Sequence, residues 1–130
     1  MSYTLRHFRE DEFLPDGFTD FSVMDPRILQ TCDDIRDLLG VPCKINADGR
    51  QWCGYRTPDC TLGAAHSQHR LGHAADLHPV GMTADDARAI IRHAVAAGKL
   101  PYLGGVEVGV SWVHVDTRPR VGGKVLEFSK

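Results

Sequence analysis

Residues 67–78, SQHRLGHAADLH, place three histidines and one aspartate within twelve positions. Imidazole and carboxylate groups are the side chains that bind transition-metal ions and move protons near neutral pH. Leu71 and Gly72 indicate a turn, and residues 74–78 after it are predicted to form a strand. The stretch therefore predicts a turn and a strand that together carry a polar site.

Two helices are predicted around this segment. The first covers 26–39, with Asp25 as its cap and Gly40 as its left-handed end. One face of this helix is apolar, and the acidic opposite face, which includes Asp33, is expected to be solvated. The second helix follows a capping box that begins at Thr83 and extends to about residue 97.

Short strands make up the rest of the predicted fold, and residues 1–24 are expected to be an irregular arm that packs its phenylalanines onto the domain. The first two strands are expected to form a hairpin through the Asn-Ala-Asp-Gly turn at 46–49. The order of elements predicts an α+β fold, a small and mostly antiparallel sheet with helices packed on one side. The predicted strands are 43–46, 51–55, 74–78, 105–108, 111–117 and 124–128.

The composition is that of a globular protein. Of 130 residues, 42% are hydrophobic and 25% charged, which predicts one domain over 1–130. A net charge of −2 gives no basic surface for nucleic acid or anionic membranes, so neither is expected as a partner. The charged N-terminus and the absence of a long apolar run predict synthesis in the host cytoplasm without a signal peptide. The protein is also expected to be a monomer. Its four cysteines are expected to be free thiols, with a Cys53–Cys60 or Cys43–Cys60 disulfide as the alternative.

The histidines allow two arrangements of metal ligands. His69 and His73 have the i, i+4 spacing of a helical zinc motif, but Arg70 stands where that motif needs its glutamate. The other arrangement pairs His69 with Asp76 and takes its third ligand from His114, on the strand predicted at 111–117. Two histidines and one aspartate with an open fourth position are typical of catalytic zinc. We therefore expect Zn²⁺ on these three residues.

These residues lie in motifs that resemble the zinc D-alanyl-D-alanine carboxypeptidase family, metallopeptidases of the DD-peptidase/Hedgehog fold. The pattern SxHxxGxAxD covers 67–76, preceded by GYRT at 54–57 and followed by VHVD at 113–116. The opening residues His7, Phe8, Glu12 and Phe13 are also similar to the start of single-domain members. The resemblance thus covers nearly the whole chain.

The resemblance implies roles for single residues. It makes His69, Asp76 and His114 the zinc ligands, and it makes Arg56 the residue that holds a substrate carboxylate or carbonyl. A planar, permanently charged guanidinium suits that task. Ser67 is expected to orient the ligand loop or to contact substrate.

One position departs from the family. Several members carry the general base three residues before the last zinc histidine, where this chain has Ser111. Two carboxylates remain as alternatives. Asp116 shares the strand face of His114 and is either the base or a partner that orients the imidazole. Glu107 lies on a neighbouring predicted strand, and sequence does not rank the two.

The resemblance implies a zinc metallopeptidase that hydrolyses a peptide bond in peptidoglycan stem peptides. D-Ala-D-Ala carboxypeptidase and endopeptidase activities both occur in such proteins. A compact domain without an export signal suits a phage or prophage endolysin that a holin releases to the cell wall. The alternative is a zinc-binding but non-catalytic, Hedgehog-like structural or binding module of a phage, which Ser111 keeps open.

Overall fold

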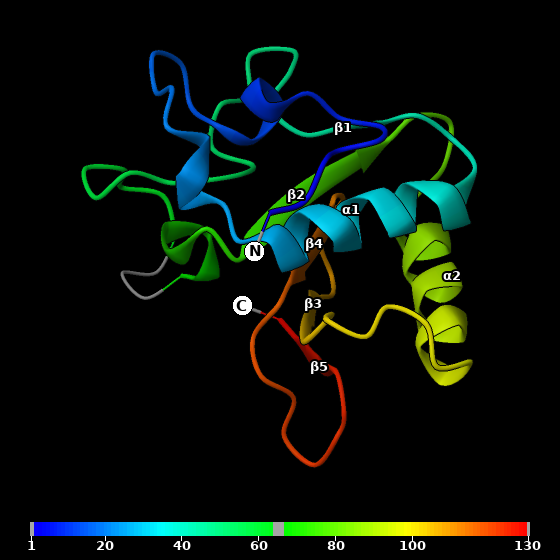
Figure 1. Ribbon diagram of the computed structural model, residues 1–130. Helices are drawn as coiled ribbons and strands as arrows, with labels where there is room; N and C mark the ends of the chain where they lie inside the picture. Colours follow the sequence, from blue (N-terminus) through cyan, green and yellow to red (C-terminus); the bar gives the residue numbers. More distant parts are fainter. Residues whose placement is uncertain (1, 64–66, 130) are drawn as a thin grey trace.

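The computed structural model describes residues 2–63 and 67–129, so His66, expected at the surface or beside the site, lies outside the described residues. Within these described residues, two α-helices, five strands and three short 3₁₀ helices follow one another (Figure 1). In chain order they are η1 Glu10–Phe13, η2 Phe21–Val23, α1 Pro26–Leu39, β1 Cys43–Lys44, η3 Gln68–Leu71, β2 Ala74–Pro79, α2 Ala84–Ala96, β3 Gly105–Glu107, β4 Val113–Asp116 and β5 Leu126–Phe128.

Local signals place both helices. In α1 the Asp25 carboxylate accepts from the Arg27 amide at 2.8 Å, and Gly40 closes the helix with φ of 68°. A positive φ costs glycine little because it has no Cβ, which is why the helix ends there. Thr83 caps α2 by accepting from the Asp86 amide at 3.1 Å. Both predicted helices are confirmed.

The five strands form one sheet in the order β1-β2-β4-β3-β5. All pairs are antiparallel except β3 with β5, which run parallel. Both helices contact β2 and each other (Figure 1). The predicted α+β class with a mostly antiparallel sheet is therefore confirmed.

Alternation along β2 and β4 separates an apolar face from a polar one. Leu77, Val113 and Val115 are fully buried in the core that α1 and α2 cover. Their neighbours along the strands point to the opposite face, because successive strand residues alternate. Asp76 and His114 are directly paired across the two strands, so their side chains lie next to each other.

The predicted hairpin between 43–46 and 51–55 is wrong. β1 pairs with β2 instead, with Lys44 opposite His78. The Asn46 side chain donates to the Leu14 carbonyl at 2.9 Å and accepts from the Cys53 amide at 2.9 Å. Because this side chain occupies the amide that a strand ladder needs, the segment after the turn forms no strand.

The acidic face of α1 is not simply solvated. Asp33 is fully buried and accepts hydrogen bonds from the Tyr3 hydroxyl at 2.8 Å and from the amides of Arg6 and His7 at 2.8 and 3.0 Å. A buried carboxylate is stable only when such donors replace water. Asp33 therefore holds the N-terminal arm against α1. As predicted, the arm also places aromatic side chains in the core, among them Phe13.

The four cysteines are free thiols, as predicted, although only Cys32 and Cys60 are fully buried. Among the described residues, no helix has both the length and the apolar character that crossing a membrane requires.

Candidate functional site

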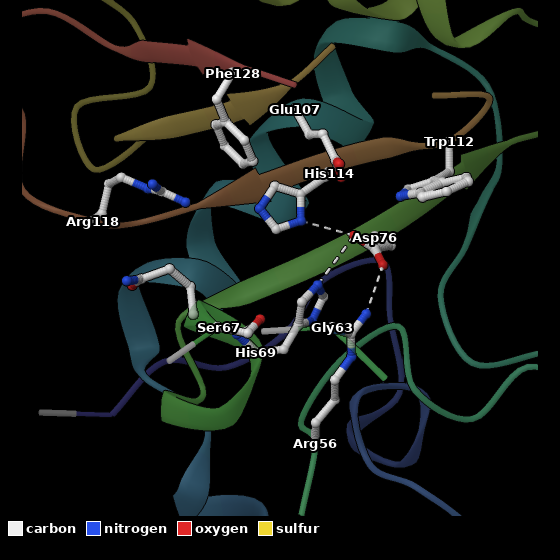
Figure 2. Close-up of a pocket in the computed structure, with 11 residues that line it drawn as sticks. Arg56, Gly63, Ser67, His69, Asp76, Glu107, Trp112, His114, Arg118 and Phe128 are labelled. Atoms are coloured by element: carbon white, nitrogen blue, oxygen red, sulfur yellow. Dashed lines mark hydrogen bonds and ion pairs between the residues drawn. The ribbon is translucent and has the colours of Figure 1, made fainter. Parts of the chain in front are cut away.

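A cavity of about 310 Å³ lies on the polar face of the sheet (Figure 2). Its floor comes from β2 and β4, one wall from η3, and another from β3 and β5. Every residue that the sequence suggested as a site residue, except Asp116, lines this cavity: Arg56, Ser67, His69, Asp76, Glu107 and His114.

Three buried side chains meet at one point of the cavity. His69 Nε2 lies 3.2 Å from Asp76 Oδ1, and His114 Nδ1 lies 3.0 Å from the same oxygen. One possible ligand atom of each residue falls within 4.8 Å of the others. These three residues form a cluster that could hold a metal ion, and it is the set expected from the sequence.

The outer nitrogen of each ring fixes its tautomer. His69 Nδ1 lies 2.8 Å from the Gly54 carbonyl oxygen, which can only accept a hydrogen bond. His114 Nε2 lies 2.9 Å from Asp116 Oδ2, and an ionised carboxylate oxygen likewise can only accept a hydrogen bond. Both outer nitrogens therefore carry protons, so a ring without a second proton directs the lone pair of its inner nitrogen toward Asp76.

Two lone pairs and a carboxylate oxygen that face one another repel unless a cation lies among them. Either a proton or a metal ion satisfies this arrangement. Burial lowers the pKa of His114, but the carboxylates of Asp116 and Asp76 outweigh it and raise the pKa to about 9. Burial likewise opposes ionisation of Asp76, yet hydrogen bonds from His114 and His69 hold its pKa well below the ordinary range. The donor set and its spacing fit zinc, whose bonds to nitrogen and oxygen are about 2.0–2.2 Å.

Asp116 is fully buried, and both of its carboxylate oxygens accept hydrogen bonds. Arg118 Nε and Nη2 donate to its two oxygens at 2.7 and 2.6 Å, while His114 occupies Oδ2 from the other side. Burial raises its pKa, but these hydrogen bonds outweigh the burial and lower the pKa to about 2. Asp116 thus touches His114 at the nitrogen that faces away from the cluster, the position of a carboxylate that orients a ligand.

Glu107 has the opposite environment. It is 3% exposed, and its Oε2 has no hydrogen-bond partner among the described residues. Figure 2 shows its side chain directed from β3 toward the His114 side of the cleft. Because a buried, unpaired carboxylate oxygen costs free energy, this one is a candidate for proton transfer or ligand contact.

Arg56 lies at the edge of the cluster with 12% of its side chain exposed. Its Nη2 is 3.6 Å from Asp76 Oδ2, and its Nε donates to the Trp52 carbonyl at 2.9 Å. Ser67 caps η3 by accepting from the His69 amide at 3.3 Å, so it fixes the turn that carries the first imidazole. Ser67 also lines the cavity.

Two other histidines of the motif region, His73 and His78, point away from the cluster. His73 Nε2 lies 3.6 Å from Asp25 Oδ2, so it does not join His69 as an i, i+4 pair of ligands. His78 Nε2 faces the Cys53 thiol at 3.4 Å. Both rings therefore face partners other than the three candidate ligands.

The cavity lining also includes Trp112, Arg118 and Phe128, to which the sequence gave no role. The Arg118 guanidinium carbon lies 4.6 Å from the centre of the Phe128 ring, and the His114 and Phe128 ring centres are 5.6 Å apart. Arg118 follows Asp116 by two positions, which was the one available signal. Phe128 gave none, since only the parallel pairing of β5 with β3 brings it to the cleft.

Comparison with known proteins gives one result. No curated protein and no solved structure matches the chain. A family model described as Peptidase M15 matches residues 7–116, a span that holds the three candidate ligands together with Arg56, Glu107 and Asp116. Because the match covers most of the chain, the protein belongs to the peptidase M15 family.

Proposed function

We propose that this protein is a zinc peptidase that hydrolyses a peptide bond in peptidoglycan stem peptides. The observation that carries the proposal is the cluster of His69, Asp76 and His114, in which two lone pairs and a carboxylate converge inside a cleft. Zinc bound there would lower the pKa of a water molecule to about 7 and polarise a carbonyl group. Family membership supports the reaction class, and the stem-peptide substrate is part of the proposal.

Glu107 is the proposed general base. Its unpaired Oε2 accepts a proton from the attacking water and passes it to the leaving amine. Asp116 is an unsuitable base because His114 and Arg118 already occupy its oxygens. In this proposal Asp116 is a positioning residue, which keeps the His114 lone pair directed into the cluster.

Arg56 is the proposed substrate-binding residue. Its guanidinium lies beside Asp76 at the edge of the cleft, where it can donate to a substrate carbonyl or carboxylate. The Trp52 carbonyl holds its Nε and so limits its freedom. A side chain held in this way positions a peptide more effectively than a flexible one. Ser67 contributes by fixing η3 and by lining the same wall.

One observation supports the alternative function, a zinc-binding module without catalytic activity. Ser111, at the position where several relatives carry their base, is exposed and is absent from the described cavity lining. A chain without any base would still hold zinc. The two functions differ in what Glu107 does.

A lysis assay separates them. Purified protein is added to outer-membrane-permeabilised cells, and turbidity is followed with zinc, with chelator, and after zinc is restored. The proposed peptidase clears the suspension only with metal, and Glu107→Gln does not clear it while still binding zinc. A wild-type protein that binds zinc stoichiometrically and releases no muropeptide would establish the non-catalytic module instead. The endolysin role stays a proposal, for which lysis from outside is the first requirement.

A further inference from the structure

A second cavity of about 440 Å³ adjoins the first one. The two cavities share three lining residues, Arg56, Asp76 and Trp112, so they meet beside the candidate metal ligands. Asp76, one of the three candidate ligands, therefore forms part of the wall of both. The cleft does not end at the cluster but continues past it toward the segment 49–53.

The cluster thus has binding surface on two sides. Figure 2 shows Arg118 and Phe128 on one side of the three candidate ligands, and Trp112 on the other. The second cavity lies on the Trp112 side and is also lined by Arg50, Trp52 and His78. A peptide that crosses the cluster would contact protein both before and after the bond at the reacting centre.

We propose that the cleft binds several residues on each side of the scissile bond, so that the protein is an endopeptidase and not a carboxypeptidase. This inference rests on the proposed function of the same site. A carboxypeptidase that removes one D-alanine needs a subsite that closes after a single residue. Here the space beyond Asp76 is far larger than one alanine requires and is lined by two indole rings.

The lining also indicates what the second cavity takes. Aromatic rings cover the aliphatic and amide faces of a peptide, and a guanidinium recognises a carboxylate. Arg50 is exposed, and its Nη1 forms an ion pair with Asp48 Oδ2 at a distance of 3.7 Å, so the guanidinium can still donate to a ligand from its other nitrogens. The second cavity therefore suits a stem-peptide segment that carries a carboxylate beyond the bond that is cut.

The experiment compares two substrates of the zinc-loaded full chain by mass spectrometry of the products. One is a free stem pentapeptide that ends in D-Ala-D-Ala, and the other is a purified cross-linked muropeptide dimer. We expect cleavage of a bond with two or more residues on each side, with no release of single D-alanine. Release of D-alanine alone would overturn the inference while leaving the proposed peptidase intact. No product from either substrate would instead refute the proposed function itself.

Variants of the second cavity give an independent test. Arg50→Ala removes an exposed charge and should raise KM for the cleaved dimer roughly two- to fivefold at unchanged kcat, the range for one screened ion pair. Trp52→Ala removes a larger contact and should raise KM about tenfold. The control is Lys124→Ala, an exposed cation absent from the described lining of both cavities, with no expected effect. If both cavity variants keep the wild-type KM while folded by circular dichroism, the second cavity binds no substrate and the inference falls.

Discussion

Two neighbouring strands each bring one buried carboxylate to the same region, and the two have opposite surroundings. On β4, both oxygens of Asp116 are paired, with His114 on one side and Arg118 on the other. On β3, Glu107 Oε2 has no partner among the described residues. Residue type and burial are nearly the same, so neither of them decides what a carboxylate does here. The difference lies in which donors are nearby.

Space as well as charge maintains this difference. A Cβ on Gly105 would lie 2.5 Å from Asp116 Oδ1 and 2.6 Å from Arg118 Nε. Glycine at this position of β3 therefore leaves room for the ion pair to lie flat against the strand. Glu107, two residues further along, lies beyond the reach of that pair and keeps a free oxygen.

The largest expected effect on activity comes from substitution of Glu107, the unpaired carboxylate. Glu107→Gln should lower kcat by on the order of 10²–10⁴, the usual contribution of general acid–base catalysis, because the amide cannot take the proton. Zinc content should stay at the wild-type level, since among the described residues no hydrogen bond or ion pair joins Glu107 to the three candidate ligands. Kinetics on muropeptides and elemental analysis check both parts. Full activity in this variant would remove Glu107 as the base.

Because Asp116 is paired with His114, the stability of the metal-free protein should depend on pH. The pKa of His114 is raised from 6.5 to about 9, so its stabilising contribution is complete below pH 6.5 and is lost as pH rises through 9. The pKa of Asp116 is lowered to about 2, so its own contribution changes only in acid. Unfolding by urea at pH 6 and pH 9 should differ by up to about 3 kcal/mol.

Zinc sharpens that test, because a metal ion replaces the proton between the rings. The zinc-loaded protein should show little of the loss between pH 6 and 9. Measurements should stop at pH 9, since burial raises the pKa of the Cys53 thiol to about 11 and adds a separate loss above that point. Equal pH profiles with and without zinc would contradict the assignment of His114 to the cluster.

A smaller effect is expected when the paired carboxylate is neutralised. Asp116→Asn should weaken zinc affinity roughly 10–100-fold, because the imidazole loses the partner that fixes its tautomer and orientation. Added zinc should then restore most of the activity, which a lost base would not allow. Competition with a coloured chelator measures the affinity. Wild-type affinity with greatly reduced kcat would reverse the roles of Asp116 and Glu107.

The smallest effect should come from substitution of Arg118, which donates to Asp116. Arg118→Ala leaves Asp116 bonded to His114 but removes its bidentate partner, so zinc affinity should fall by roughly two- to fivefold. Arg118→Lys keeps the charge and should recover part of the loss. Lys124→Ala is the matched control. A larger loss of zinc affinity in Arg118→Ala than in Asp116→Asn would contradict the inference that Arg118 acts through Asp116.

The ends of the helices and the candidate ligands could be predicted from the sequence because they depend on residues close together in the chain. Asp25, Gly40 and Thr83 act within one turn of the chain, so caps and ends of helices follow from neighbouring residues. The three candidate ligands followed from motifs and from strand alternation. The segment 51–55 was mispredicted because a side chain, that of Asn46, takes the place of a backbone partner. Strand propensity carries no information on such a substitution.

The sequence by itself determined the α+β class, the two helices and the set of His69, Asp76 and His114, because periodicity and short motifs encode them. Only the tertiary structure distinguished the paired oxygens of Asp116 from the unpaired Oε2 of Glu107, the residue that we propose as the base, since both are acidic residues on predicted strands. It also buried Asp33 beneath the N-terminal arm and brought Phe128 to the cleft through the parallel pairing of β5. These outcomes depend on which distant segments supply donors and space, and hydrogen-bond partners far apart in the chain leave no periodic trace in the sequence.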